Sequence, residues 1–209
     1  MDLTGSLSSD ILSLSELQYL DLSNNKGLTG TLPSLIGNLN QLTTLILIGC
    51  SFFGPIPDSI GSLQQLVFLA LNANNFSGPI PPSIGNLSNL SWLDLTENQL
   101  NGTIPVSSGS TTGLDMLVKA RHLCFNWNSL NGPVPSNLNN LTSVRELCKF
   151  VNLSNNNLNG PSPNLTGMNF LNSLDMNNNS FNSSADHPWH TSLEALTTLY
   201  HLNPHHLLI

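Results

Sequence analysis

The chain has 209 residues, of which only 8% are charged, and a formal net charge of −7 with five Lys and Arg in total. So few basic residues exclude a patch that would hold nucleic acid or an anionic membrane surface. No apolar run of about 18 residues occurs, and Met1 is not followed by a charged and then apolar leader, so we expect neither a membrane anchor nor a signal peptide in the chain as written.

One spacing of Leu, Asn, Gly and Pro returns along most of the chain. In its most regular copy, residues 63–86, four framework leucines from Leu63 to Leu71 precede Asn74 and a Phe-x-Gly-x-Ile-Pro element. The equivalent of Asn74 in the next copy is Asn98, so the period is 98 − 74 = 24 residues. A fixed period of this length with this spacing is that of a leucine-rich repeat.

Taken in chain order, the sequence predicts a partial repeat over residues 1–13, seven repeats over 14–185, and an incomplete eighth repeat with a divergent tail over 186–209. Extra residues enter repeat five around 106–115 and repeat six shortly before its strand. Both insertions follow the Ile-Pro position, where a return segment tolerates added loop.

The repeats predict an α/β leucine-rich repeat solenoid, a curved right-handed arc. In each Leu-x-Leu segment the leucines point inward and the residue between them points outward, because strand side chains alternate. The copies then stack into a parallel sheet on the concave face, with 3-10 or irregular segments on the convex side. An Asn ladder is expected to bond the backbone groups left unpaired where each strand ends.

The outward residue six positions before each ladder position is aromatic in most repeats. This column contains Tyr19, Phe68, Trp92, His122 and Phe150. Two interpretations are open. The rings form a stripe that binds a ligand, since interfaces favour aromatics, or they stack on one another as framework.

The densest polar and aromatic cluster on the predicted concave face consists of Trp92, Asp94, Glu97, His122 and Trp127, and we expect ligand contact there. A catalytic site is not expected, because an open face offers Asp94 and His122 no water-excluding pocket. No metal or cofactor site is expected either, since the late histidines fall where the repeat pattern breaks.

The three cysteines are too few and too scattered for a disulfide framework. Cys50 takes a ladder position, Cys124 is expected to point outward with a small chance of reactivity, and Cys148 is expected to be buried.

Nine Asn-x-Ser/Thr sequons are candidate N-glycosylation sites and favour an exported protein. Their asparagines are Asn75, Asn86, Asn89, Asn101, Asn140, Asn152, Asn164, Asn178 and Asn182.

The Gly-x-Ile-Pro elements carry a family resemblance. Those starting at Gly54, Gly78, Gly102 and Gly132 resemble the plant-specific Leu-x-Gly-x-Ile-Pro repeat of plant receptor-like kinase ectodomains, and residues 27–63 look like subfamily VIII of these kinases. The resemblance covers roughly residues 3 to 199. It implies a parent protein with a signal peptide, the repeats, one membrane helix and a Ser/Thr kinase. Of these parts, only the repeats are expected in this chain.

The resemblance implies a non-catalytic recognition module on the extracellular face of the plasma membrane. Its expected partners are an extracellular peptide, small-molecule or protein ligand and a co-receptor. The chain has no Gly-rich loop, Val-Ala-Ile-Lys, His-Arg-Asp or Asp-Phe-Gly motif, so we expect no phosphoryl transfer by the chain itself. Two alternatives stay open: a secreted inhibitor of a pathogen enzyme, similar to polygalacturonase inhibitors, and an inactive truncated gene product.

Overall fold

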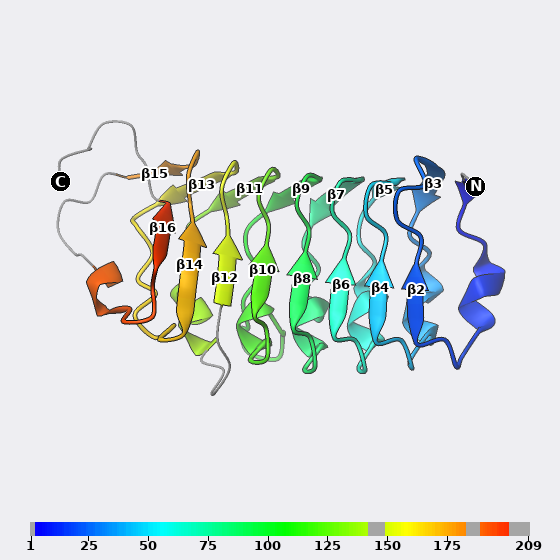
Figure 1. The fold of residues 1–209 in the computed structure, drawn as a ribbon, viewed down its shortest axis with the longest axis horizontal. Helices are drawn as coiled ribbons and strands as arrows, with labels where there is room; N and C mark the ends of the chain where they lie inside the picture. The colour runs from blue at the N-terminus through cyan, green and yellow to red at the C-terminus, as the bar shows by residue number, and fades with distance from the viewer. Residues whose placement is uncertain (1–2, 142–148, 183–188, 201–209) are drawn as a thin grey trace.

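The computed structural model describes residues 3–141, 149–182 and 189–200. The repeats stack in chain order along one axis, from the blue end to the red end of Figure 1, and their strands form two eight-stranded parallel sheets. The predicted leucine-rich repeat solenoid with a parallel sheet is therefore confirmed. Among the described residues no helix has the length and apolarity to cross a membrane.

The front sheet is the one that the Leu-x-Leu pattern predicts, and it faces the reader in Figure 1. Its strands, in spatial order from the N-terminal end, are β2 (Tyr19–Asp21), β4 (Thr44–Ile46), β6 (Phe68–Ala70), β8 (Trp92–Asp94), β10 (His122–Cys124), β12 (Lys149–Asn152), β14 (Leu171–Asp175) and β16 (Thr198–Tyr200).

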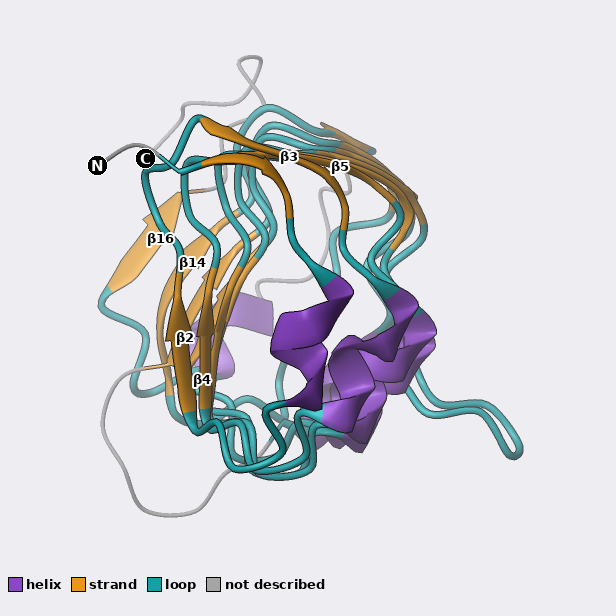
Figure 2. Cartoon of the chain, turned by 90° about the vertical axis from the view of Figure 1, so that its right-hand side faces the viewer, coloured by secondary structure: helices purple, strands orange, loops and turns teal. Residues whose placement is uncertain are grey.

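The second sheet was not predicted. It lies at an angle to the front sheet, across the top of the solenoid in Figure 2. Its strands are β1 (Thr4–Ser6), β3 (Gly27–Thr31), β5 (Ser51–Gly54), β7 (Asn75–Pro79), β9 (Gln99–Gly102), β11 (Ser129–Gly132), β13 (Asn157–Gly160) and β15 (Ser180–Phe181).

Short 3-10 helices cover the side opposite the front sheet, as predicted (Figure 2). They are η1 (Ser9–Ser13), η2 (Ser34–Asn38), η3 (Asp58–Ser62), η4 (Pro82–Asn86), η5 (Leu114–Met116), η6 (Ser136–Asn140) and η7 (Trp189–Ser192). The Pro of the Ile-Pro element caps several of them. Pro33, Pro57 and Pro81 each precede a helix with an extended ψ, which suits the fixed φ of proline.

The interior is one continuous apolar core filled by the framework leucines. Leu45, Leu69 and Leu93 are fully buried in successive front-sheet strands and lie in register with one another. Burying one such side chain contributes about 1.5–3 kcal/mol. Because each copy buries its leucines against its neighbours, stability comes from stacking and not from any single repeat.

The Asn ladder is confirmed by its hydrogen bonds. The Asn98 side chain donates through Nδ2 to the Leu71 and Leu95 carbonyls, at 3.0 and 3.1 Å, and accepts from the Phe76 backbone N–H at 3.0 Å. Asn74 bonds its neighbours in the same way. Cys50 takes this position in repeat two, where its Sγ lies 3.1 Å from the Leu22 carbonyl oxygen.

Two glycines explain why Gly recurs at fixed positions in this repeat. Gly54 has a φ of +76°, a left-handed conformation that glycine adopts without strain, and it ends a strand of the second sheet. Gly37 has no such φ, but a Cβ there would lie 2.5 Å from the Ser59 carbonyl oxygen of the next repeat. One glycine permits the turn and the other permits close stacking.

The insertion in repeat five is an ordered loop. Asp115 is buried and accepts from the Ser107 N–H and hydroxyl, at 2.7 and 2.6 Å, while the Thr112 hydroxyl donates to the Pro82 carbonyl at 3.0 Å. The insertion before repeat six lies at 142–148, outside the described residues, as does Cys148.

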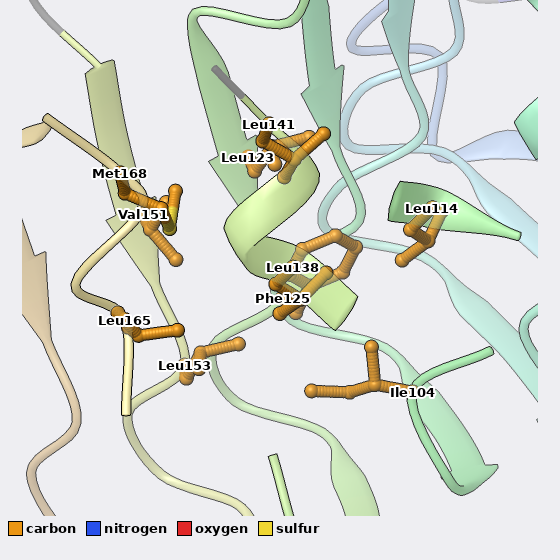
Figure 3. Close-up of a pocket in the computed structure, with 10 residues that line it drawn as sticks. All are labelled: Ile104, Leu114, Leu123, Phe125, Leu138, Leu141, Val151, Leu153, Leu165 and Met168. Atoms are coloured by element: carbon orange, nitrogen blue, oxygen red, sulfur yellow. The ribbon is translucent and has the colours of Figure 1, made fainter. Parts of the chain in front are cut away.

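The apolar core contains a small cavity between repeats five and six. The cavity has a volume of about 10 Å³, and Figure 3 shows the side chains that surround it. It is lined by Ile104, Leu114, Leu123, Phe125, Leu138, Leu141, Val151, Leu153, Leu165 and Met168. A space of this size is about that of one water molecule, yet its walls offer no polar partner. The cavity is therefore a packing defect and not a ligand site.

Candidate functional site

The aromatic column is brought into register on the front sheet. Strand pairing aligns Phe68 with Trp92, Trp92 with His122, and His122 with Phe150. Their rings stack nearly parallel, with centroids 5.1, 3.5 and 5.2 Å apart and interplanar angles of 15°, 9° and 17°. We call these four residues the ring ladder.

The stacking decides which parts of the rings a ligand could reach. Inner faces are covered by the neighbouring rings, as the framework interpretation expects, whereas the edges point outward and Trp92 is still 36% exposed. Parallel rings in this geometry stabilise the sheet by about 0.5–1.5 kcal/mol per pair. The ladder is thus part of the framework and also a rigid apolar ridge on an open face.

His122 lies at the centre of the ladder and contacts the thiol of Cys124, with Nε2 and Sγ 3.1 Å apart. Burial lowers the pKa of the His122 imidazole, and the Asp94 carboxylate opposes that shift only in part. Burial, followed by the negative charge of Asp94, raises the pKa of Cys124 to about 12. At neutral pH a neutral imidazole therefore meets a protonated thiol.

Cys124 was expected to point outward, with reactivity only as a minor alternative, and its surroundings do not favour reactivity. Its position in the strand does face outward, but Cys124 is only 5% exposed because the stacked His122 ring leans toward it. A thiol with a raised pKa is a poor nucleophile. Cys124 therefore acts as a packing residue beneath the ladder.

A second column of the front sheet contains short polar side chains that bond their own backbone. Asp21, Asp94, Asn152 and Asp175 each accept a hydrogen bond through Oδ1 from the N–H two residues later, at 2.9–3.0 Å. These Asx turns end the strands and fix the carboxylates in place. We did not predict them, although the recurring Asp-Leu-Ser and Asp-Leu-Thr tripeptides are a recognisable signal.

The predicted cluster divides into two parts. Trp92, Asp94 and His122 lie on the front sheet, whereas Glu97 and Trp127 lie on the bend that follows it. Both bend residues have left-handed φ values, +53° and +56°, and they are adjacent because the Asn98 N–H donates to the Trp127 carbonyl at 3.2 Å.

Trp127 is 58% exposed. Its left-handed backbone conformation is strained for a bulky residue. The bend therefore presents an indole beside a carboxylate at the lateral edge of the front sheet. Tyr19, at the N-terminal end of the aromatic column, is equally exposed on β2.

The described residues hold no group of three or more His, Cys, Asp or Glu side chains arranged to bind a metal ion. Asp94 and His122 lie on adjacent strands, but the thiol that contacts His122, Cys124, is buried and protonated. The arrangement suits contact with a bound molecule and does not suit bond-breaking chemistry.

The sequons lie mostly outside the strands of the front sheet. Asn152 is on a strand of the front sheet, and the other eight lie on the second sheet, the 3-10 helices or the connecting segments. On the second sheet, for example, Asn75 and Asn101 are exposed in β7 and β9. The front sheet from β2 to β10 is free of sequons.

Comparison with known proteins identifies the repeat. The Leucine Rich Repeat family model matches residues 16–39, 41–63, 65–87 and 89–110. The chain is 33% identical, with a TM-score of 0.83, to the ectodomain of the plant membrane receptor kinase GASSHO1/SCHENGEN3 from Arabidopsis thaliana, solved in complex with CASPARIAN STRIP INTEGRITY FACTOR 2. That match covers 94% of this chain and 22% of the receptor chain.

Two further solved structures are similar. A TDR receptor is 32% identical with a TM-score of 0.81, over 94% of this chain and 32% of that one. The Arabidopsis receptor kinase HAESA, in complex with the peptide hormone IDA and the co-receptor SERK1, is 30% identical with a TM-score of 0.82, over 96% of this chain and 33% of that one. The chain thus spans between a fifth and a third of these ectodomains. It is a leucine-rich repeat solenoid with the fold of plant receptor kinase ectodomains.

Proposed function

We propose that this chain is a recognition module of a plant receptor-like kinase, of the type found in subfamily VIII, and that it binds an extracellular peptide on its front sheet. The ring ladder and the flanking carboxylates form the contact surface, with Glu97 and Trp127 at its lateral edge. The chain acts outside the cell as part of a larger receptor, and its own repeats perform no catalysis.

The ring ladder is the observation that carries this proposal. Its residues are held rigidly by stacking, so they lose little conformational freedom when a ligand binds. Aromatic ridges beside charged groups are where interfaces concentrate their binding energy. The HAESA structure contains a peptide hormone on the same type of fold, which favours a peptide over the other ligand classes.

The positions of the sequons are compatible with the same surface. N-linked glycans are bulky and keep partners away from the surface that they cover. With eight of nine sequons away from the front sheet, glycosylation would leave the region from Tyr19 to His122 open.

The test is a capture experiment followed by measured affinities. The purified chain is exposed to peptides secreted by plant cells, the bound peptide is sequenced and resynthesised, and its affinity is measured by titration calorimetry. Replacing Trp92→Ala removes the centre of the ridge and should weaken binding by about 2 kcal/mol, roughly 30-fold.

Two variants make that loss interpretable. Trp92→Phe keeps a ring in the ladder and should retain most of the affinity, and Gln99→Ala changes an exposed residue of the second sheet in the same repeat and should have no effect. An affinity that is equal in the wild type and Trp92→Ala would remove the ladder from the binding site. Capture of a large secreted enzyme in place of a peptide would favour the inhibitor alternative.

A further inference from the structure

The aromatic column is interrupted at one position. Beyond Phe68 it continues through Thr44 of β4 to Tyr19 of β2, and the strand pairing keeps all three in register. Apart from a Phe52–Phe76 stack in the buried core, the ring contacts among the described residues join the four members of the ladder, and none of them includes Tyr19. Thr44 therefore separates the ladder from one more ring in the same column.

The spacing of the rings in the ladder gives the width of the space above Thr44. Phe68 and His122 lie two strands apart, and the Trp92 ring fits between them at centroid distances of 5.1 and 3.5 Å. Tyr19 and Phe68 are also two strands apart. Because neighbouring strands are about 4.8 Å apart throughout a sheet, the space above Thr44 has the width of one ring. The Thr44 side chain is too short to fill it.

Both walls of this space are aromatic. Phe68 has one face against Trp92 and the other toward the Thr44 strand. Tyr19 is 58% exposed, and its hydroxyl is among the groups near Asp21, so its ring leans along the strand as His122 leans toward Cys124. A planar group that enters from solvent would contact a ring on either side and the methyl group of Thr44 below.

A carboxylate lies at the rim of this space. Asp21 follows Tyr19 on the same face of β2, and its Oδ1 accepts from the Ser23 hydroxyl and N–H, at 2.6 and 2.9 Å. Asp21 is negatively charged near neutral pH, and these hydrogen bonds lower its pKa further below the ordinary value of 3.8. With a net charge of −7, the chain suits a ligand that has a positive group next to its planar one.

We propose that the space between Tyr19 and Phe68, above Thr44, is a subsite for one aromatic side chain of an extended peptide, and that a neighbouring Lys or Arg of the peptide pairs with Asp21. The subsite rests on the proposed peptide-binding function and names the residue class that it selects. It is continuous with the ring ladder and lies at the end of the front sheet far from the Asn152 sequon.

The test uses fluorescein-labelled pentapeptides and fluorescence anisotropy with the whole chain. Gly-Gly-Tyr-Arg-Gly has the proposed pair, Gly-Gly-Leu-Arg-Gly lacks the ring, and Gly-Gly-Tyr-Glu-Gly reverses the charge. Two stacked faces should favour the first peptide over the second about tenfold, and the reversed charge should weaken binding further.

Matched variants place the preference at the subsite. Thr44→Phe fills the space with a ring of the protein itself and should abolish the preference for tyrosine over leucine, while raising the unfolding temperature by completing the stack. Thr44→Val has the same size as the wild type and should keep the preference. Far-ultraviolet circular dichroism checks that both variants are folded.

Several outcomes would overturn the subsite. Equal affinities for the tyrosine and leucine peptides, an undiminished preference in Thr44→Phe, or no binding of any peptide at about 1 mM would each do so. The failure of the proposed function has a different signature. If the captured peptide binds the front sheet in a manner sensitive to Trp92→Ala but tolerates Thr44→Phe, the function stands and the subsite does not.

Discussion

At the scale of single residues, His122 shows how the ladder fixes a chemical state. The imidazole is stacked between Trp92 and Phe150, and its Nε2 lies within hydrogen-bond distance of the Cys124 thiol. Burial disfavours the charged form of the imidazole. A residue that could titrate near neutral pH is thus kept as a neutral aromatic ring. His122 serves the ladder as a ring, and its position gives a measurable pH dependence.

The direction of that pH dependence follows from the lowered pKa. The folded chain binds a proton at His122 more weakly than the unfolded chain does, where the ordinary value is 6.5. The stabilisation from the neutral ring is therefore fully present above about pH 6.5 and is lost as the pH falls through the lower folded value.

His122→Phe removes this titration and keeps the ring. Urea unfolding between about pH 7.5 and about pH 5 should show a smaller loss of stability in His122→Phe than in the wild type. The two proteins differ only at residue 122, so the difference between their pH profiles is due to His122. Identical pH profiles for the two proteins would show that His122 protonates as freely when folded as when unfolded.

At the scale of the element, the front-sheet strands differ in how well they fill the interior. The central inward residue is Leu in β6, β8 and β10 but is Val151 in β12, which lines the cavity between repeats five and six. Figure 3 shows Val151 among the apolar side chains that surround this cavity.

Val151→Leu should add one methylene to that space and stabilise the chain by about 0.8 kcal/mol. The measurement is the free energy of unfolding in urea. Val134→Leu is a matched control, because Val134 is a buried valine outside the cavity lining and should not gain from enlargement. A destabilised Val151→Leu variant would mean that the cavity is closed to a larger side chain.

The front sheet could be predicted because its signal is simple alternation. The Leu-x-Leu spacing identifies Leu69 and Leu93 as inward and Phe68 and Trp92 as outward, and the structure confirms both faces. The second sheet could not be predicted in this way. One of its strands, β7, contains Gly78 and Pro79, residues that ordinarily indicate a turn. The strands of this sheet pair because the same left-handed glycine φ recurs in neighbouring repeats.

The positions of the candidate site residues along the sheet could be predicted, but the packing of their side chains could not. Spacing alone put Trp92 and His122 on adjacent strands, but their 3.5 Å stacking depends on side-chain torsions that no period records. The burial of Cys124 follows from the lean of the His122 ring, and the separation of Glu97 and Trp127 from Asp94 follows from the bend after each strand.

At the scale of the whole molecule, the two long surfaces have different properties. The front sheet has ordered rings and carboxylates, and a single sequon at Asn152, whereas the rest of the solenoid surface carries the other eight sequons. A solenoid that uses one face for recognition should tolerate glycans everywhere except on that face. This contrast provides the most direct test of the account.

One substitution places a glycan in the middle of the proposed binding face. Asp94→Asn, with Leu95 and Thr96 following, completes an acceptor sequon on β8. The fold should survive, because Asn152 makes the same Asx turn in β12 that Asp94 makes in β8. The variant is expressed in a eukaryotic secretory host, and its affinity for the captured peptide is measured before and after treatment with a peptide N-glycosidase, which converts the glycosylated Asn to Asp and so restores the wild-type sequence.

We predict that the glycosylated variant binds the peptide at least about 30-fold more weakly than the wild type and that the enzyme restores full affinity. Wild-type chain treated with the same enzyme controls for removal of the native glycans. If the glycosylated variant binds the peptide as tightly as the wild type does, the front sheet is not the recognition surface.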